Sequence, residues 1–77
     1  MGMIDFDKIE NRKRIGRKIA LLRKERELTA LELAELTGLK RENLTRIELG
    51  KYSTGIDILG KIAEALGCTL DFISQND

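Results

Sequence analysis

Several residue types are scarce in this chain of 77 residues, and each absence excludes a class of function. The sequence has no histidine and a single cysteine, Cys68, so it predicts no metal site of these ligands and no internal disulfide framework. It has no proline and no tryptophan. No apolar run approaches the length of about 20 residues that a helix needs to cross a bilayer. No glycine-rich phosphate loop is visible either. We therefore expect no catalytic site, no cofactor and no membrane partner.

Aliphatic and charged residues dominate instead, with 42% hydrophobic and 35% charged residues. This composition is typical of helical proteins, and the length fits one domain. We expect a single all-α domain over residues 1–77, with a flexible arm at 1–7, a helical core at 8–74 and a frayed tail at 75–77. A lone cysteine, which we expect to be buried, suits the reducing cytoplasm, where we expect the protein to act.

The net charge is only +1, but it is distributed unevenly. Residues 8–26 hold nine basic and two acidic side chains, whereas the rest of the chain is acidic on balance. This asymmetry favours an anionic partner for one face. Arg12 and Lys13, near the start of the first helix, are the best candidates for contacts with phosphate. The alternative is ordinary pairing of charges along a solvated helix.

Apolar periodicity, cap residues and glycines predict five helices, over residues 8–26, 30–37, 41–49, 56–66 and 70–74. Asp7 and Glu10 have capping-box spacing at the start of the first helix, and Thr29 and Glu32 have it at the start of the second. Gly38 suits the left-handed turn that ends the second helix.

The second and third helices are separated by a short turn at Gly38, which favours a steep crossing, and Ala34 is small enough to let the two helices meet. The apolar seam expected to hold the third helix consists of Leu33, Leu39, Leu44 and Ile47. The outward strip carries Arg41, Glu42 and Thr45, with Arg46 beside it. From the residues alone, this strip is either a solvated face or a reading surface.

Three stretches, "IGRKIALLRKERELT", "LELAELTGLKRENLTRIELGK" and "LGKIAEALGCTLDFI", resemble the phage-repressor and Cro-like helix-turn-helix family, also called the XRE family. The resemblance covers about three quarters of the chain. It implies a compact five-helix bundle of the lambda-repressor-like kind and a small transcriptional regulator that binds double-stranded DNA. Such a protein would bind as a homodimer to an inverted repeat whose half-sites lie about 34 Å apart.

The resemblance also implies roles for individual residues. The base-contacting positions match Arg41, Glu42, Asn43 and Arg46. The backbone-contacting positions match Thr29, Ala30, Lys40, Thr45 and Lys51, to which the basic first helix would add Arg12 and Lys13. Arg23 and Glu48 match a largely buried salt bridge. Ala30 stands where the family usually has Gln, and Lys40 stands where it usually has a Ser or Thr cap.

Some apolar residues fall where the periodicity predicts exposure, namely Leu31, Leu36, Leu49, Ile58 and Phe72. By the same resemblance, Ile58 and Phe72 are the candidates for a dimer contact. Two rival functions share this fold. One is an antitoxin or accessory protein that acts through a protein partner such as a toxin. The other is a scaffold that has lost DNA binding.

Overall fold

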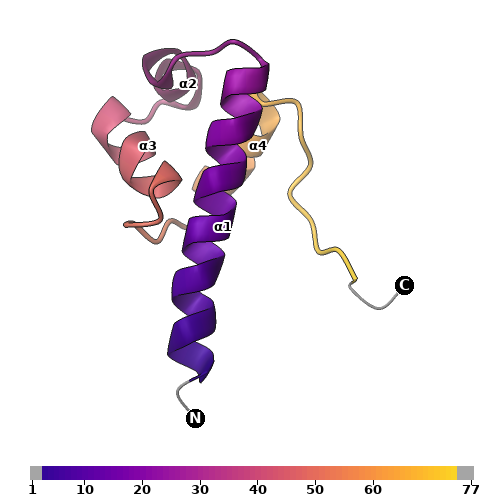
Figure 1. The fold of residues 1–77 in the computed structure, drawn as a ribbon. Coiled ribbons are helices and arrows are strands. Elements are labelled where there is room, and N and C mark those ends of the chain that lie inside the picture. Colours follow the sequence, from indigo (N-terminus) through magenta and orange to yellow (C-terminus); the bar gives the residue numbers. More distant parts are fainter. Residues whose placement is uncertain (1–2, 75–77) are drawn as a thin grey trace.

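The computed structural model describes the backbone of residues 3–74 and the side chains of residues 9–74. It contains four helices, which are α1 (Met3–Glu25), α2 (Ala30–Thr37), α3 (Arg41–Glu48) and α4 (Ile56–Ala65). Residues 3–74 form no strand, so the all-α class is confirmed (Figure 1). No helix in this part of the chain is both long enough and apolar enough to cross a membrane.

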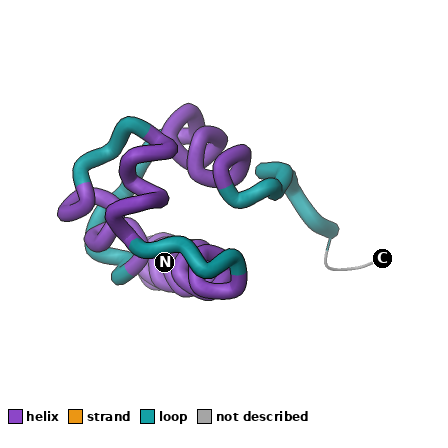
Figure 2. Tube along the Cα trace, turned by 90° about the horizontal axis from the view of Figure 1, so that it is seen from above, coloured by secondary structure: helices purple, strands orange, loops and turns teal. Residues whose placement is uncertain are grey.

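The long α1 forms the spine of the molecule (Figure 1). Helices α2 and α3 lie to one side of it, and the segment after α4 runs away from the helices on the other side (Figures 1 and 2). Contacts join α1 to α3, α2 to α3, and α2 to α4. The buried apolar core comprises Ile19, Leu33, Ala34, Leu44, Ile47, Ile62 and Leu66. It includes most of the seam that the sequence predicted for α3, with Leu39 packed against it.

All four helices end in the same hydrogen-bond pattern, in which a left-handed residue reverses the chain. At the end of α1, Glu27 has φ 55°, and the Leu28 N–H donates to the Arg23 carbonyl at 3.1 Å. The other three helices place glycine at the same position, namely Gly38, Gly50 and Gly67, with φ of 73°, 74° and 71°. Glu27 is thus the only one of these four residues whose side chain opposes its backbone conformation.

One expected boundary is wrong. The first helix begins at Met3 rather than Lys8, so Asp7 lies inside it and not at its cap, and the expected arm is helical from Met3 onward. Neither glycine nor proline interrupts residues 3–7, and acidic side chains in a first helical turn favour the helix dipole. The tail expected at 75–77 lies outside the described residues.

The fifth helix, expected over residues 70–74, is absent, because this segment has no regular secondary structure. The side chains of Leu70, Phe72 and Ile73 are 42%, 100% and 88% exposed. So short a helix is unstable unless an apolar face packs against the protein. Here the segment stands off from the other helices, so that packing is missing (Figure 2).

The buried stripe of α4 also differs from the expected one. Ile56, expected to face inward, is 73% exposed, whereas Ile58, expected to be exposed, is half-buried against the core. The reason is the helical period, because Ile58, Ile62 and Leu66 are spaced four residues apart and share one face. Ile56 is the first residue of the helix and lies off that face.

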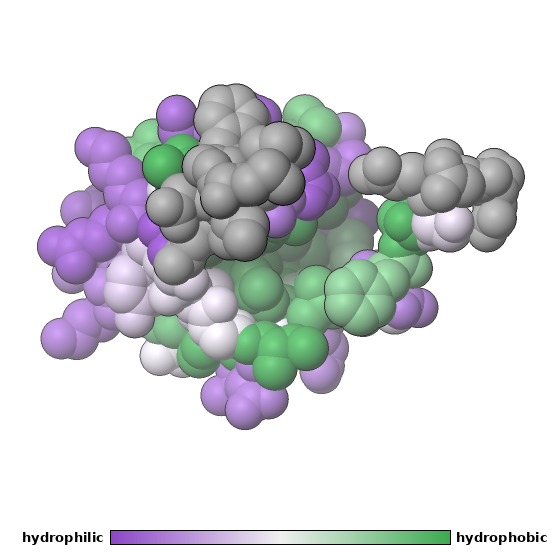
Figure 3. All heavy atoms as spheres, turned by 90° about the horizontal axis from the view of Figure 1, so that it is seen from below, coloured by the Kyte–Doolittle hydropathy of each residue, from purple (hydrophilic) through white to green (hydrophobic). Residues whose placement is uncertain are grey.

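An apolar hollow follows the side of α1 that faces α4 and the C-terminal segment. Figure 3 shows apolar side chains gathered there, between the helices and the segment that projects from them. One part of the hollow, about 140 Å³, is floored by core residues of α1 and α4. An adjoining part, about 630 Å³, opens between α1 and residues 68–73.

Candidate nucleic-acid interface

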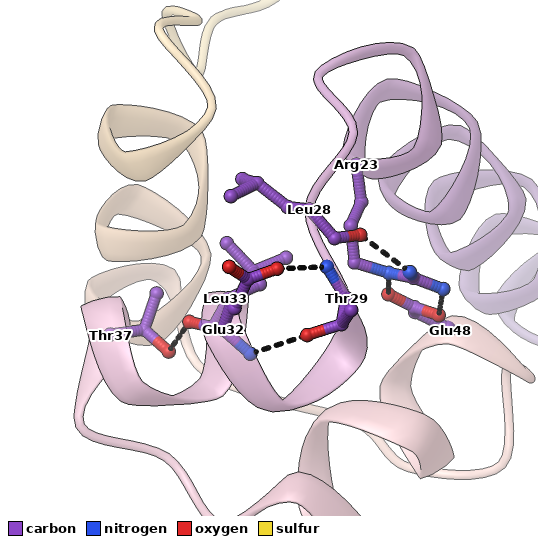
Figure 4. Close-up of polar contacts among 7 residues, drawn as sticks. All are labelled: Arg23, Leu28, Thr29, Glu32, Leu33, Thr37 and Glu48. Atoms are coloured by element: carbon purple, nitrogen blue, oxygen red, sulfur yellow. Dashed lines mark hydrogen bonds and ion pairs between the residues drawn. The ribbon is translucent and has the colours of Figure 1, made fainter.

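The start of α2 is fixed by the predicted capping box (Figure 4). The Glu32 N–H donates to Thr29 Oγ1 at 3.1 Å, and the Thr29 N–H donates to Glu32 Oε1 at 2.8 Å. The hydrogen bonds from Thr29 favour the carboxylate and lower the pKa of Glu32 below its ordinary value. At the other end of α2, the buried Thr37 hydroxyl donates to the Leu33 carbonyl at 2.9 Å. Both ends of this short helix are therefore locally satisfied.

An ion pair joins α1 to the end of α3 (Figure 4). Arg23 Nε donates to Glu48 Oε2 at 2.8 Å, and Arg23 Nη2 donates to Glu48 Oε1 at 3.1 Å. The third nitrogen of Arg23, Nη1, donates to the Leu28 carbonyl at 2.9 Å. The two side chains are only 13% and 10% exposed. Donating to the Glu48 carboxylate stabilises the charged guanidinium and raises the pKa of Arg23 above its already high value. The pair implied by the resemblance is present, and it links the end of α3 to the turn before α2.

Two glycines let α1 and α3 approach closely. A Cβ atom on the buried Gly16 would collide with the carbonyl oxygens of Ile47 and Glu48. A Cβ atom on Gly50 would lie 2.9 Å from the Lys13 Cα. The role of Gly16 was not predicted from the sequence. The available signal was a glycine inside a predicted helix, next to the apolar arc, which marks close backbone approach.

The base-contacting candidates lie on the part of α3 that the core leaves open. Arg41, Glu42 and Arg46 are exposed, and Asn43 is half-buried. Within the described residues, none of these four side chains has a hydrogen bond or an ion pair. By contrast, Leu44 on the other side of the helix is fully buried. The structure thus separates a packed face of α3 from a polar face that is available to a partner.

The backbone-contacting candidates are spread over several elements. Thr29 is exposed at the start of α2, and Ala30 is half-buried against the core. Lys40 is the N-cap residue of α3 and makes no side-chain hydrogen bond there. Thr45 and Lys51 are exposed, within α3 and just beyond it.

The first helix brings basic side chains to the loop that follows α3. Lys13 lies against Gly50, directly before Lys51. Arg12 lines a cavity of about 150 Å³ together with Tyr52 and Ser53 of that loop. Arg12 and Lys13 therefore lie beside the end of α3 rather than on a remote part of α1. Among the described residues, no group of acidic or cysteine side chains could hold a metal ion.

The two dimer-contact candidates differ in their surroundings. Phe72 is fully exposed on the C-terminal segment, whereas Ile58 is half-buried on α4. Leu31, Leu36 and Leu49 are exposed, as the periodicity predicted.

The fold and these contacts define a helix-turn-helix protein, and comparison with known families agrees. A family model described as Helix-turn-helix matches residues 19–73, which is more than half of the chain. The chain therefore belongs to the helix-turn-helix family, and its Cro-like character is confirmed. This is a class of DNA-binding transcription regulators.

Three relatives place the chain more closely. It is 39% identical over 59 residues to the immunity repressor protein of Bacillus phage phi105. It is 44% identical over 45 residues to an uncharacterised HTH-type transcriptional regulator of Methanothermobacter thermautotrophicus, and 46% identical over 41 residues to Antitoxin HicB 1 of Photorhabdus laumondii. These matches cover 77%, 58% and 53% of the chain, which spans 41%, 65% and 26% of the lengths of the three relatives.

A solved structure shares the fold. The clp gene regulator ClgR from Corynebacterium glutamicum superimposes with a TM-score of 0.75 at 25% identity. The match covers 77% of this chain and 76% of that one.

Proposed function

We propose that the protein is a small cytoplasmic transcriptional regulator that binds double-stranded DNA sequence-specifically, with α3 in the major groove. One observation carries the proposal. Leu44 and Ile47 bury one side of α3, while the polar side chains on its other side have no partner among the described residues. A helix held in this way can present its outer face to base edges while its inner face stays packed in the core.

The side chains on that face suit base recognition. Arg41 and Arg46 can each donate two hydrogen bonds to guanine, and Asn43 can pair with adenine. Glu42 can accept from cytosine N4, and its negative charge repels phosphate. Each good bidentate pair discriminates against a wrong base by about 1–3 kcal/mol. Glu42 therefore favours selective binding over general attraction to DNA.

Backbone contacts would position the helix. The Ala30 and Leu31 N–H groups, in the first turn of α2, have no acceptor among the described residues and can bind a phosphate beside Thr29. Lys40 and Thr45 flank the reading surface on α3 itself. Lys51, with Arg12 and Lys13 next to the end of α3, supplies positive charge at that end.

A homodimer on an inverted repeat is part of the proposal. Recognition helices in such dimers contact half-sites about one helical turn, or about 34 Å, apart. The exposed Phe72 and the half-buried Ile58 are the contact candidates.

Selection of binding sites from random duplexes, repeated at two salt concentrations, tests the proposal. Arg41→Ala should weaken binding to the selected site by about 1–3 kcal/mol and relax the preference at one position. Lys51→Ala should instead weaken binding to all sequences alike and reduce the salt slope by about one. Lys61→Ala, which removes an exposed charge on α4, is the matched control. Failure to enrich any site at low salt would refute the proposal.

A second candidate is an antitoxin-type protein that acts mainly through a protein partner. The specific observation is the similarity to Antitoxin HicB 1, together with the exposed Leu31 and Leu36 on α2. Leu36 also borders a shallow pocket with Leu28 and Glu35. An apolar surface rimmed by acidic side chains suits a protein partner better than it suits DNA.

Variants on the two surfaces separate these candidates. For the second candidate, Leu31→Asp with Leu36→Asp should abolish neutralisation of a co-expressed toxin, whereas Arg41→Ala should leave neutralisation intact. If both variants neutralise the toxin as the parent does, or if no toxin is neutralised, the antitoxin role is wrong.

A further inference from the structure

The hollow along α1 is continuous and mainly apolar. Its first part is lined by Ile15, Ile19, Leu22, Leu59, Ile62 and Leu66. Its second part lies between α1 and residues 68–73, where Leu21 adds a further apolar side chain and Arg14, Arg17 and Lys18 form a basic rim. Ile15, Lys18 and Leu22 line both parts, so the two form one groove. Figure 3 shows this apolar surface open to the outside.

The C-terminal segment beside the groove is apolar and poorly packed. Leu70, Phe72 and Ile73 are 42%, 100% and 88% exposed within four consecutive residues. Single exposed apolar residues are ordinary, but a contiguous group marks a surface that is covered in the working molecule. The apolar segment and the apolar groove therefore lie next to each other, and the segment does not fill the groove.

We propose that two copies of the chain exchange these segments, so that residues 69–73 of each copy lie in the groove of the other. The contact is reciprocal, because each copy supplies one segment and one groove. It closes as a two-fold dimer, in which neither the segments nor the grooves are left open to recruit further copies. The inference rests on the proposed homodimer and specifies how that dimer is built.

A second copy fits the groove better than other occupants do. The chain's own segment forms one wall of the wider part of the groove, so in this position it cannot also fill the groove. The charges are complementary as well. The segment carries Asp71, and the rim that it would meet on the other copy carries Arg14, Arg17 and Lys18. Exchange of an identical element between protomers is also a low-cost route to a dimer, because the segment needs no new fold.

Cross-linking between two differently marked chains tests the exchange. Cys68 is the only cysteine, so Cys68→Ser gives a thiol-free background. One chain then carries Leu21→Cys on α1, and the other carries Ile73→Cys on the segment. After mixing, unfolding and refolding together, a short bis-maleimide should join the two chains at least tenfold more than it joins either chain to itself. A double variant with both cysteines should form covalent dimers.

The contrary result is equally clear. If the double variant closes within one chain at every concentration, and the mixed chains do not join, the segment packs onto its own α1 and the exchange is wrong.

Sedimentation without DNA supplies a second readout. Phe72→Asp with Ile73→Asp should weaken dimerisation at least tenfold. The control Leu36→Asp introduces the same acidic residue at an exposed position of α2 and should leave dimerisation unchanged. Unaltered dimerisation of the Phe72/Ile73 variant would overturn the exchange.

DNA binding is scored separately from assembly. Arg41→Ala should bind the selected duplex more weakly and keep the cross-linked dimer, which supports the exchange independently of recognition. A chain that selects single half-sites but never cross-links would refute the exchange and leave the proposed DNA binding standing. A chain that cross-links but selects no duplex would support the exchange and refute the DNA-binding proposal.

Discussion

Glu48→Gln tests whether the ion pair with Arg23 holds α3 in place. The substitution keeps the size of the side chain and removes its charge. Arg23 would retain its hydrogen bond to the Leu28 carbonyl but lose its ionic partner. Because the Arg23 side chain is only 13% exposed, its charge would be left largely buried. Leaving one member of a buried pair without its partner costs about 3–5 kcal/mol, and the residual exposure places our estimate at about 3 kcal/mol.

Thermal and urea unfolding at neutral pH, followed by circular dichroism, measure this cost. For a domain of this size, 1 kcal/mol shifts the melting temperature by roughly 4–8 °C, so Glu48→Gln should lower it by about 12–24 °C. Glu25→Gln, at the end of α1, is the matched control. Its pair with Arg26 is 3.7 Å long and exposed, and such pairs contribute about 0–1 kcal/mol.

A double variant separates the strength of the pair from the cost of breaking it. Arg23→Met with Glu48→Leu replaces both charges by apolar side chains, which is often neutral or stabilising for buried pairs. We expect it to unfold near the parent temperature. If Glu48→Gln itself unfolds within about 0.5 kcal/mol of the parent, the pair contributes no more than a surface pair does. The seam and Gly16 would then hold α3 alone, and the reasoning would be refuted.

Four further substitutions follow from the backbone and the caps. Glu27→Gly should raise the free energy of unfolding by about 1 kcal/mol, since the left-handed conformation penalises a side chain; an unchanged or lower urea midpoint would contradict this. Gly60→Ala should add about 1 kcal/mol of helix propensity, because no atom lies within 4 Å of the new Cβ. Gly16→Ala should instead destabilise by about 1–3 kcal/mol through the collision with α3, so equal melting temperatures for these two variants would refute the geometry. Glu32→Gln should flatten the loss of stability on acidification. The lowered pKa of Glu32 contributes stability above its ordinary value of 4.5, which disappears as the pH falls through the folded value, so unaltered acid melting curves would argue against the box with Thr29.

The sequence was sufficient to predict the structure of the middle of the molecule, because its signals there are local. Thr29 and Glu32 specify the start of α2 by their own hydrogen bonds, and Gly38 specifies its end by its backbone freedom. Leu44 and Ile47 were correctly placed in the core, because their spacing leaves only one face to bury. The Arg23–Glu48 pair was implied by resemblance, since 25 residues separate its members and no local pattern connects them.

The errors have a common physical origin, which is that the ends of the chain and of its helices depend on packing. Leu70 and Ile73 have helical spacing, but spacing does not supply a surface to pack against. Ile56 follows the apolar period yet lies at the first turn of α4, off the buried face. At the other end, Met3 starts a helix that no sequence signal required and none forbade. The DNA-contacting roles stay predictions, because exposure shows availability and not a bound partner.

The outer face of α3 has a consequence for how such a protein can diverge. Arg41, Glu42 and Arg46 make no side-chain hydrogen bond or ion pair with the described residues, so exchanging them alters what the helix presents and leaves the unfolding free energy nearly unchanged. Gly16 and Glu48 behave in the opposite way, because both hold the end of the helix against α1. A duplicated copy of this chain could therefore drift to a new target through the first group without any compensating change elsewhere. Selection for folding stability and selection for the preferred DNA sequence would then act on different residues.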